Sequence, residues 1–176
     1  MAARTVLQEA DIARALTRIA HEILESNRGA EGLILLGIPT RGVTLAERLG
    51  PIISEIAGVE VPVGSVDITL FRDDLSKQPT RSPKRTEIPE GGIDGKTIVL
   101  VDDVLFSGRS IRAALDALQS IGRPSVVRLA ILVDRGHREL PIRPDFVGKN
   151  IPSARSERVN VRLSELDEVD EVTIES

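Results

Sequence analysis

The most informative stretch of this chain runs from Ile98 to Ser110, where an apolar segment passes into two acids and then into a short polar loop. Ile98 to Val101 is an unbroken aliphatic run, which is typical of a parallel strand covered on both faces. After Gly108 and Ser110, apolar residues recur at helical spacing. A loop at the start of a helix offers free backbone N–H groups at the positive end of the helix dipole. The stretch therefore predicts a strand, a phosphate-binding loop and a helix.

The acidic pair Asp102 and Asp103 requires its own explanation, because carboxylates repel a bound phosphate. Neighbouring side chains on a strand point to opposite faces, so at most one of the two is expected to face the site. We interpret one as an acceptor for sugar hydroxyls and the other as a positioning carboxylate. A turn with a helix cap explains an isolated Asp-Asp pair, but not the loop and helix that follow. A receiver-like or phosphatase-like fold also has such a pair at a strand end, without needing Gly108 and Ser110 at a helix start.

This stretch resembles the 5-phosphoribosyl-1-pyrophosphate (PRPP) signature of type I phosphoribosyltransferases. In that family two acids bind the ribose hydroxyls, and the following loop binds the 5′-phosphate. The resemblance assigns the first role to Asp102 and Asp103. It assigns the second role to Val104, Leu105, Phe106, Ser107, Gly108, Arg109 and Ser110. It also implies an α/β fold with a central, mainly parallel sheet flanked by helices, a small hood and a flexible loop.

Length and composition limit the alternatives. The 176 residues are expected to form one domain, residues 1–176, and the absence of cysteine excludes disulfides, thiolate metal sites and thiol nucleophiles. No membrane span or signal peptide is visible, so a cytoplasmic protein without a membrane partner is expected. The net charge of −4 is uneven, with +3 over residues 135–160 and −5 over residues 161–176. Total charge therefore does not decide whether the chain binds an anionic macromolecule.

Apolar periodicity predicts the other elements. One amphipathic helix is expected over residues 11–27, closed by Arg28-Gly29, and a second through residues 45–56, which Pro51 is expected to kink or divide. Further strands are expected at residues 33–38, 63–70, 126–133, 146–152 and 158–163, with an edge strand at 171–175. The segments 146–152 and 158–163 are expected to form the hood.

A second strand, loop and helix sequence brings a hydroxyl, a guanidinium and free amides together at Thr40-Arg41-Gly42. From the local residues alone, an ordinary strand-to-helix turn is an equally good interpretation. The resemblance assigns Thr40, Arg41 and Gly42 to the pyrophosphate-binding loop. It thereby makes Arg41 the third member of the catalytic set, with Asp102 and Asp103.

Two further polar segments flank these loops. Residues 76–95 are long and charged, which fits a surface loop or a lid equally well by composition. Type I enzymes close a flexible loop at this position, and the resemblance assigns to it Arg72, Asp73, Arg81 and Arg85. Residues 134–143 follow the strand at 126–133, so this third polar loop is expected at the same sheet end, where ligands of parallel sheets bind. For His137, a hydrogen-bonded loop histidine is favoured over a general base, because the sequence shows no nucleophile to partner it.

Flanking matches extend the resemblance to nearly the whole chain and to the bifunctional pyrimidine-operon regulator family, PyrR. The matching segments are Leu16-Thr17-Arg18-Ile19-Ala20-His21, Gly37 with Thr40-Arg41-Gly42, Asp67-Ile68-Thr69-Leu70 with Arg72-Asp73-Asp74-Leu75, and Leu132 to Arg143 with Val147-Gly148-Lys149-Asn150. Members convert uracil and PRPP to UMP and diphosphate, and bind the leader of pyrimidine-biosynthesis (pyr) mRNA when UMP or UTP is present. Phe106 replaces the family's common tyrosine, and Ser107 keeps the hydroxyl of its usual threonine.

The resemblance implies uracil phosphoribosyltransferase activity and a homodimer or higher homo-oligomer. It implies Mg²⁺ held mainly by PRPP, with no direct protein ligand assigned and Asp102 or Asp103 as candidates. It implies uracil-side contacts from Arg135, Gly136 and His137, and RNA contacts from Thr17, His21, Arg138 and Arg143. Two alternatives stay open: an RNA-binding regulator that uses the PRPP pocket only to sense nucleotides, and a phosphoribosyltransferase for another base.

Overall fold

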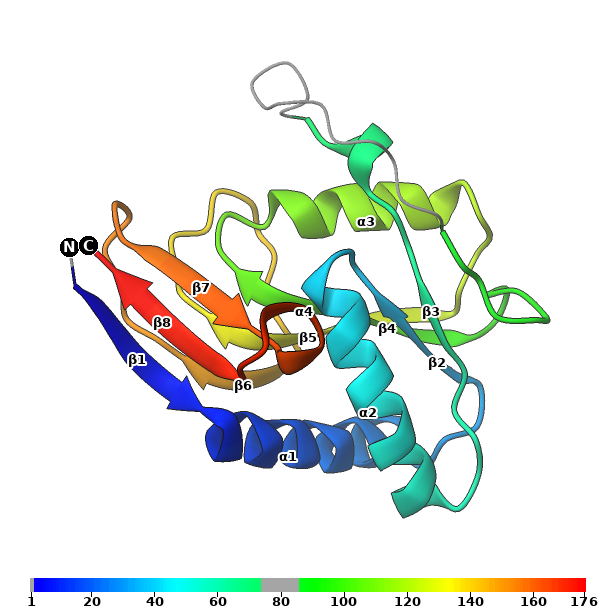
Figure 1. Cartoon of the computed structure of the whole chain (residues 1–176). Coiled ribbons are helices and arrows are strands. Elements are labelled where there is room, and N and C mark those ends of the chain that lie inside the picture. The colour runs from blue at the N-terminus through cyan, green and yellow to red at the C-terminus, as the bar shows by residue number, and fades with distance from the viewer. Residues whose placement is uncertain (1, 74–85) are drawn as a thin grey trace.

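The computed structural model describes residues 2–73 and 86–176, and its main sheet is parallel throughout (Figure 1). The strand order is β3-β2-β4-β5-β6. These strands are β2 (Leu33–Gly37), β3 (Val63–Ser65), β4 (Thr97–Leu105), β5 (Val126–Asp134) and β6 (Phe146–Asn150). The predicted α/β fold is therefore confirmed.

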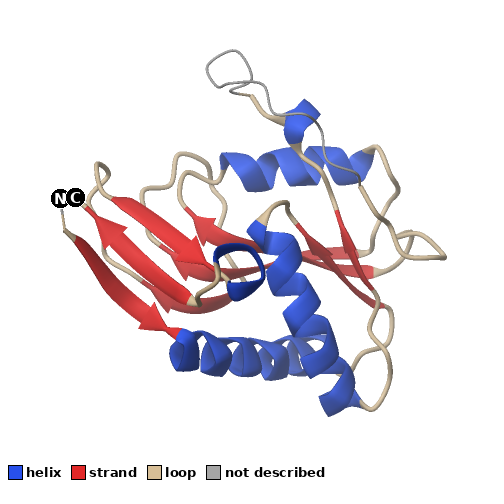
Figure 2. Ribbon diagram, in the orientation of Figure 1, coloured by secondary structure: helices blue, strands red, loops and turns tan. Residues whose placement is uncertain are grey.

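Helices cover both faces of this sheet (Figure 2). Leu33 and Leu35 pack into the core cluster that also contains residues of α1 (Glu9–Asn27) and α2 (Arg41–Ala57). Ile34 and Leu36 point the other way, into the cluster formed with α3 (Arg109–Gln119). Because alternate side chains of each strand enter different cores, a continuous aliphatic run is what this sheet requires.

A second, antiparallel sheet with strand order β1-β8-β7 forms the hood. Its strands are β1 (Ala3–Gln8), β7 (Arg158–Arg162) and β8 (Glu171–Glu175). The short helix α4 (Ser164–Asp167) connects β7 to β8. Because β1 pairs with β8 in the register Ala3 to Glu175, the two ends of the chain lie side by side (Figure 1).

Several predicted boundaries are wrong, because tertiary pairing extends or replaces the local pattern. Strand β4 continues through both acids to Leu105, since β5 pairs with it along that length. The strand predicted at 63–70 ends at Ser65, and the short 3₁₀ helix η1 (Thr69–Phe71) follows. Pro51 does not divide α2, which is one continuous helix.

The hood is also assembled differently from the prediction. Strand β6 is the edge of the main sheet, paired with β5, and does not belong to the hood. Strand β8 is the central hood strand and not an edge, because β1 and β7 pair with it on either side. Strand β1 is not predicted by the sequence pattern. Its mostly exposed residues form a strand because they pair with β8.

Arg48 of α2 connects the helix layer of the main sheet to the hood. Its guanidinium bonds Asp170 at 2.8 and 3.0 Å, and it also bonds both carboxylate oxygens of Glu165. The Arg48 side chain is 20% exposed. Hydrogen bonding from Arg48 lowers the pKa of Glu165 to about 2. This ion-pair cluster fixes the position of α4 above the end of the main sheet.

We expect Arg48→Met to lower the free energy of unfolding by about 2 kcal/mol at pH 7, between the values for exposed and buried pairs. Glu165 has a depressed pKa in the folded state, so its stabilisation is complete above pH 4.5 and is lost as the pH falls towards 2. Urea unfolding from pH 7 to pH 2 should therefore show a smaller acid loss in the variant than in the parent. The exposed Arg123→Met is the matched control, and an equal acid loss in Arg48→Met would contradict this account.

Among residues 2–73 and 86–176, no helix combines the length and the apolar character that crossing a membrane demands.

Candidate functional site

The segment after β2 is folded tightly on itself at Gly37 and lies against β4 at Gly42. A Cβ atom on Gly42 would lie 2.3 Å from the Val101 carbonyl oxygen and 3.1 Å from the Asp102 Cα atom. One on Gly37 would lie 2.4 Å from the Val43 Cα atom. The Val101 oxygen also accepts a hydrogen bond from the Ile38 N–H at 2.9 Å. The first turn of α2 is thus pressed against the acidic end of β4, and only glycine permits this approach.

The two acids of β4 have different surroundings. Asp102 is buried, with 9% exposure, and burial together with the neighbouring Asp103 carboxylate raises its pKa well above the ordinary value. Its Oδ1 accepts from the Asp103 N–H at 2.9 Å. Asp103 is half-buried, accepts from the Val104 N–H at 2.7 Å and lines a cavity. Of the two acids, Asp103 lines the cavity, and its role as the acid that faces the site stays a prediction.

The loop from Phe106 to Gly108 leads into α3 as predicted. Gly108 is the N-cap in the left-handed region, at φ 94°, and its Cβ position lies 3.1 Å from the Ile142 Cβ atom. The Ser107 carbonyl accepts from the Glu139 N–H at 2.9 Å, which ties this loop to the one after β5. Ser110 lies in the first turn of α3. The backbone groups at this helix start form the candidate site for the 5′-phosphate.

The Arg109 side chain has another role. It bonds Asp73 at 2.6 Å and Glu139 at 3.0 Å, and Glu139 in turn accepts from Arg155 at 3.2 Å. The Arg109 side chain thus links Asp73, which follows η1, to Glu139, which lies in the loop after β5. Of the predicted flexible-loop residues, Arg72 and Asp73 are described, whereas Arg81 and Arg85 lie outside the described residues.

The loop after β5 is held by its own arginines. Arg138 bonds the Asp134 carboxylate at 2.6 Å, the Ile142 carbonyl at 2.7 Å and the Phe106 carbonyl at 3.0 Å. This half-buried side chain joins the loop to the PRPP signature. The Arg138 guanidinium is thus used by internal bonds while 22% of its side chain is exposed, and its contact with RNA stays a prediction.

Phe106 lies against two of the predicted uracil-side residues. The Arg135 guanidinium is 4.2 Å from the centre of the Phe106 ring, and the His137 ring meets it edge-on at 6.0 Å. Arg135 is buried and donates to the Ala154 and Glu157 carbonyls, while its Nε has no partner among the described residues. His137 Nε2 bonds the Ser153 carbonyl at 2.5 Å. This contact fits the favoured interpretation of His137 as a hydrogen-bonded loop histidine.

A cavity of about 380 Å³ lies between strand β7 of the hood, the start of α2 and the acidic end of β4. Asp103, Arg41 and Asp167 line it together with Glu175 and the residues of β7, which include Arg158 and Arg162. Arg41 is not free, because Asp167 of α4 bonds its Nη2 at 2.7 Å and its Nε at 3.2 Å. The sequence reading did not identify Asp167, and no local pattern distinguishes it from the other acids of residues 161–176.

The described residues do not gather three or more acids, histidines or cysteines into a metal-binding group. Asp103 is nevertheless a carboxylate that lines the cavity. Mg²⁺ keeps several waters and is commonly bound by one or two carboxylates together with substrate phosphates. The residues present therefore fit a magnesium ion that arrives with a phosphorylated substrate.

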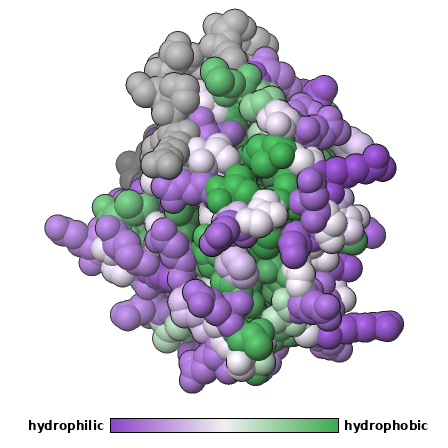
Figure 3. Space-filling model, turned by 90° about the vertical axis from the view of Figure 1, so that its right-hand side faces the viewer, coloured by the Kyte–Doolittle hydropathy of each residue, from purple (hydrophilic) through white to green (hydrophobic). Residues whose placement is uncertain are grey.

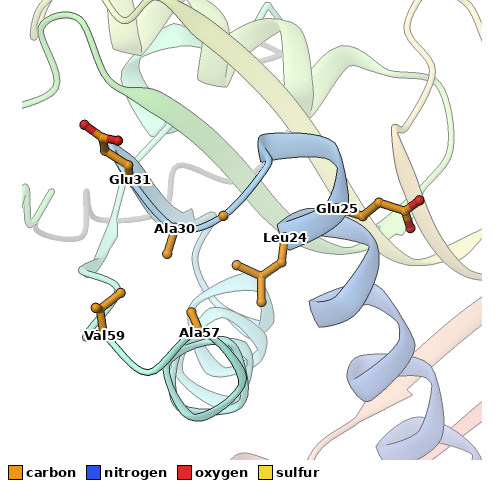
Figure 4. Close-up of a pocket in the computed structure, with 7 residues that line it drawn as sticks. Leu24, Glu25, Ala30, Glu31, Ala57 and Val59 are labelled. Atoms are coloured by element: carbon orange, nitrogen blue, oxygen red, sulfur yellow. The ribbon is translucent and has the colours of Figure 1, made fainter.

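A larger cavity of about 680 Å³ lies between the ends of α1 and α2 (Figure 4). Its lining residues are Leu24, Glu25, Gly29, Ala30, Glu31, Ala57 and Val59. Both charged members are acidic, which disfavours a phosphorylated ligand. The face of the molecule away from the hood mixes hydrophobic and hydrophilic residues (Figure 3). The predicted site residues Asp103 and Arg41 line the cavity beside β7 and not this larger one.

The predicted RNA-contacting residues lie around α1 and the segment before β6. Thr17, His21 and Arg143 are exposed. Arg18 of α1 donates to the Val147 and Gly148 carbonyls at 3.1 and 2.6 Å, which holds α1 against β6. Thr17 and His21 thus lie on α1, and Arg143 lies in the segment that precedes β6.

Comparison with known proteins agrees with this arrangement. The family model for the phosphoribosyl transferase domain matches residues 3–166. "Bifunctional protein PyrR" of Leifsonia xyli subsp. xyli is 65% identical over 99% of this chain and 98% of the relative, and that of Halalkalibacterium halodurans is 55% identical over 98% and 97%. A hypoxanthine phosphoribosyltransferase of Trypanosoma cruzi, solved as a ternary substrates complex, shares the fold with a TM-score of 0.76 at 16% identity, covering 98% of this chain and 94% of that one.

These matches exclude the receiver-like alternative, because that fold is not the one the chain shares with its relatives. From the PRPP signature, the parallel sheet with its hood and the whole-length similarity together, we conclude that this chain belongs to the bifunctional PyrR family of type I phosphoribosyltransferases.

Proposed function

We propose that the protein transfers the phosphoribosyl group of PRPP to uracil, giving UMP and diphosphate, and that it binds pyr leader mRNA in response to UMP or UTP. Both activities belong to the cytoplasm, where PRPP and mRNA are found. The catalytic half of the proposal is supported by one observation. Asp103, near the end of β4, and Arg41, at the start of α2, line the same cavity. One group suits the ribose hydroxyls and the other suits diphosphate.

The proposed chemistry needs no covalent nucleophile, because PRPP carries its own leaving group. Asp103 accepts hydrogen bonds from the ribose hydroxyls, and backbone N–H groups at the start of α3 hold the 5′-phosphate. Arg41 stabilises the charge that develops on the departing diphosphate while positive charge develops at the ribose C1. When bound, Mg²⁺ supplies further charge neutralisation on the diphosphate, with Asp103 as its candidate protein ligand.

Uracil recognition is proposed to use backbone groups more than side chains. Among the described residues no strand pairs with the outer edge of β7, which lines the cavity, so the amides and carbonyls of this edge are proposed to contact the base. Of the uracil-side candidates, Arg135 and His137 already bond backbone carbonyls. The N–H of Gly136, which has φ 79° and is exposed, already donates to the Asp134 carboxylate at 3.0 Å, so its C=O is the group proposed to contact the base.

The direct test is product formation from PRPP and Mg²⁺ with uracil, orotate, hypoxanthine or xanthine. UMP from uracil alone supports the proposal. Product from another base favours a phosphoribosyltransferase of different specificity. If no base reacts while UMP still increases RNA binding, the nucleotide-sensing alternative replaces the catalytic half.

The regulatory half rests on three exposed residues: Thr17 and His21 of α1, and Arg143 just before β6, the strand that α1 contacts. Exposed donors and cations are the groups that contact RNA backbone and unpaired bases. A homodimer or higher homo-oligomer would combine more than one such surface.

We expect His21→Ala with Arg143→Ala to weaken binding to a pyr leader RNA by about tenfold or more, because a donor and a phosphate-binding cation are lost. The slope of affinity against salt should decrease, while UMP formation stays unchanged. Filter binding at several salt concentrations measures both effects. Arg138 is left intact, since its removal would disturb the PRPP loop. The matched control is Arg123→Ala, another exposed arginine, and unchanged RNA affinity in the double variant would contradict this assignment.

A further inference from the structure

We propose that Asp167 competes with the diphosphate group of PRPP for the Arg41 guanidinium, and so limits how tightly the protein holds PRPP and the diphosphate product. This inference rests on the proposed function and adds to it a residue that controls affinity. It starts from the contact between Asp167 and Arg41. The two side chains make parallel bonds at 2.7 Å, from Nη2 to Oδ1, and 3.2 Å, from Nε to Oδ2.

The paired bonds have the geometry by which arginine also binds phosphate oxygens. A carboxylate that occupies two guanidinium nitrogens therefore occupies donors that a diphosphate would use. The pair is only partly exposed, at 33% for Arg41 and 19% for Asp167. Its attraction is consequently screened less than that of a surface pair.

Asp167 also faces the same cavity as its partner. Arg41, Asp103 and Asp167 all line the space below β7, so an anion that approaches Arg41 meets the Asp167 charge as well. Hydrogen bonding from Arg41 lowers the pKa of Asp167, so the carboxylate is ionised at neutral pH. Competition for Arg41 and direct repulsion thus act in the same direction, against the binding of diphosphate.

The Asp167 carboxylate has a second partner that keeps it in place when Arg41 turns to a ligand. Its Oδ2 accepts from the Leu163 N–H at 2.9 Å, within the same turn of chain. Losing Arg41 therefore does not leave the carboxylate without a hydrogen bond. The exchange of Arg41 between Asp167 and a substrate is correspondingly less costly.

The position of α4 does not depend on Asp167. Arg48 bonds Glu165 and Asp170 on either side of it, and the Asp170 Oδ1 accepts from the Ser164 N–H at 2.7 Å. A change of charge at position 167 can therefore be made while the turn remains attached to α2. The role of Asp167 can therefore be tested while the hood stays folded.

The test is Asp167→Asn, which retains an oxygen for the Leu163 N–H and removes the charge. We expect KM for PRPP and the dissociation constant of diphosphate, measured with Mg²⁺, to fall by about fivefold to tenfold, as loss of one competing charge at a partly buried pair implies. The value of kcat should not rise, because product release becomes slower. An unchanged or raised KM together with unchanged diphosphate affinity would overturn the proposal.

Two comparisons separate this role from a structural one. Glu165→Gln removes the same charge from the same turn but faces Arg48, and it should leave PRPP affinity unchanged. In an Arg41→Ala background the effect of Asp167→Asn should largely disappear, because the two residues act as a pair; a full effect there would contradict the competition. Calorimetry of PRPP and diphosphate binding requires no turnover. Tighter binding in Asp167→Asn without UMP formation in any variant would support the competition while refuting the proposed catalysis.

Discussion

Gly42→Ala should abolish most of the phosphoribosyltransferase activity, with kcat/KM for PRPP falling by about a hundredfold or more. The new Cβ atom would lie 2.3 Å from the Val101 oxygen, which is backbone and already holds the Ile38 N–H. The start of α2 must therefore move away from β4 and take Arg41 with it. A displacement of about 1 Å of a positioning group costs roughly a hundredfold in rate.

The same substitution should also destabilise the fold by about 1 to 3 kcal/mol, as overpacking of a tight contact does. Steady-state kinetics and urea unfolding measure the two effects separately. Glu47→Ala is the control on the exposed face of the same helix; it should change the free energy of unfolding by less than about 0.5 kcal/mol and leave kcat/KM at the parental value. A Gly42→Ala protein with parental kcat/KM would show that the close approach of α2 and β4 is unimportant for the site.

Asp103→Asn should lower UMP formation by tenfold or more, because one preorganised carboxylate that holds the ribose is replaced by a neutral amide. The residue lines the cavity, and its Oδ1 bond to the Val104 N–H can be kept by asparagine. The loss should therefore appear in kcat/KM and not in the free energy of unfolding. Steady-state assays with uracil at varied PRPP test this expectation.

Asp116→Asn provides the matched control, since it is the same replacement on the exposed side of α3. Parental turnover in Asp103→Asn would remove the ribose-binding role assigned to this carboxylate. A large loss of stability in Asp103→Asn would instead identify it as a structural residue of β4.

The sequence by itself determined the chemistry of the strand ends. An aliphatic run, an acidic pair and a glycine-containing helix start are local features. Each can be recognised in the sequence because it depends only on residues that are neighbours in the chain. The order of strand, loop and helix was equally readable for Leu33 to Gly42. Convergence of the three polar loops also followed from the sequence, because parallel strands bring their carboxyl ends to one edge.

Only the tertiary structure decided which charged side chains are available. Arg41, Arg109 and Arg138 look alike in the sequence, yet each bonds a different acid, and the partners of Arg41 and Arg109 are distant in the chain. The burial that separates Asp102 from Asp103 arises from the packing of Gly42 against β4.

The backbone structure of the hood also depends on contacts between residues that are distant in the chain. Strand β1 carries little pattern of its own and exists through its pairing with β8 at the other end of the chain. Asp167 acquires its position opposite Arg41 only when β7 and β8 place α4 above the sheet. Local residue patterns encode the chemistry of each strand end, whereas pairings between distant residues decide which groups face one another, because such contacts depend on the path of the whole chain.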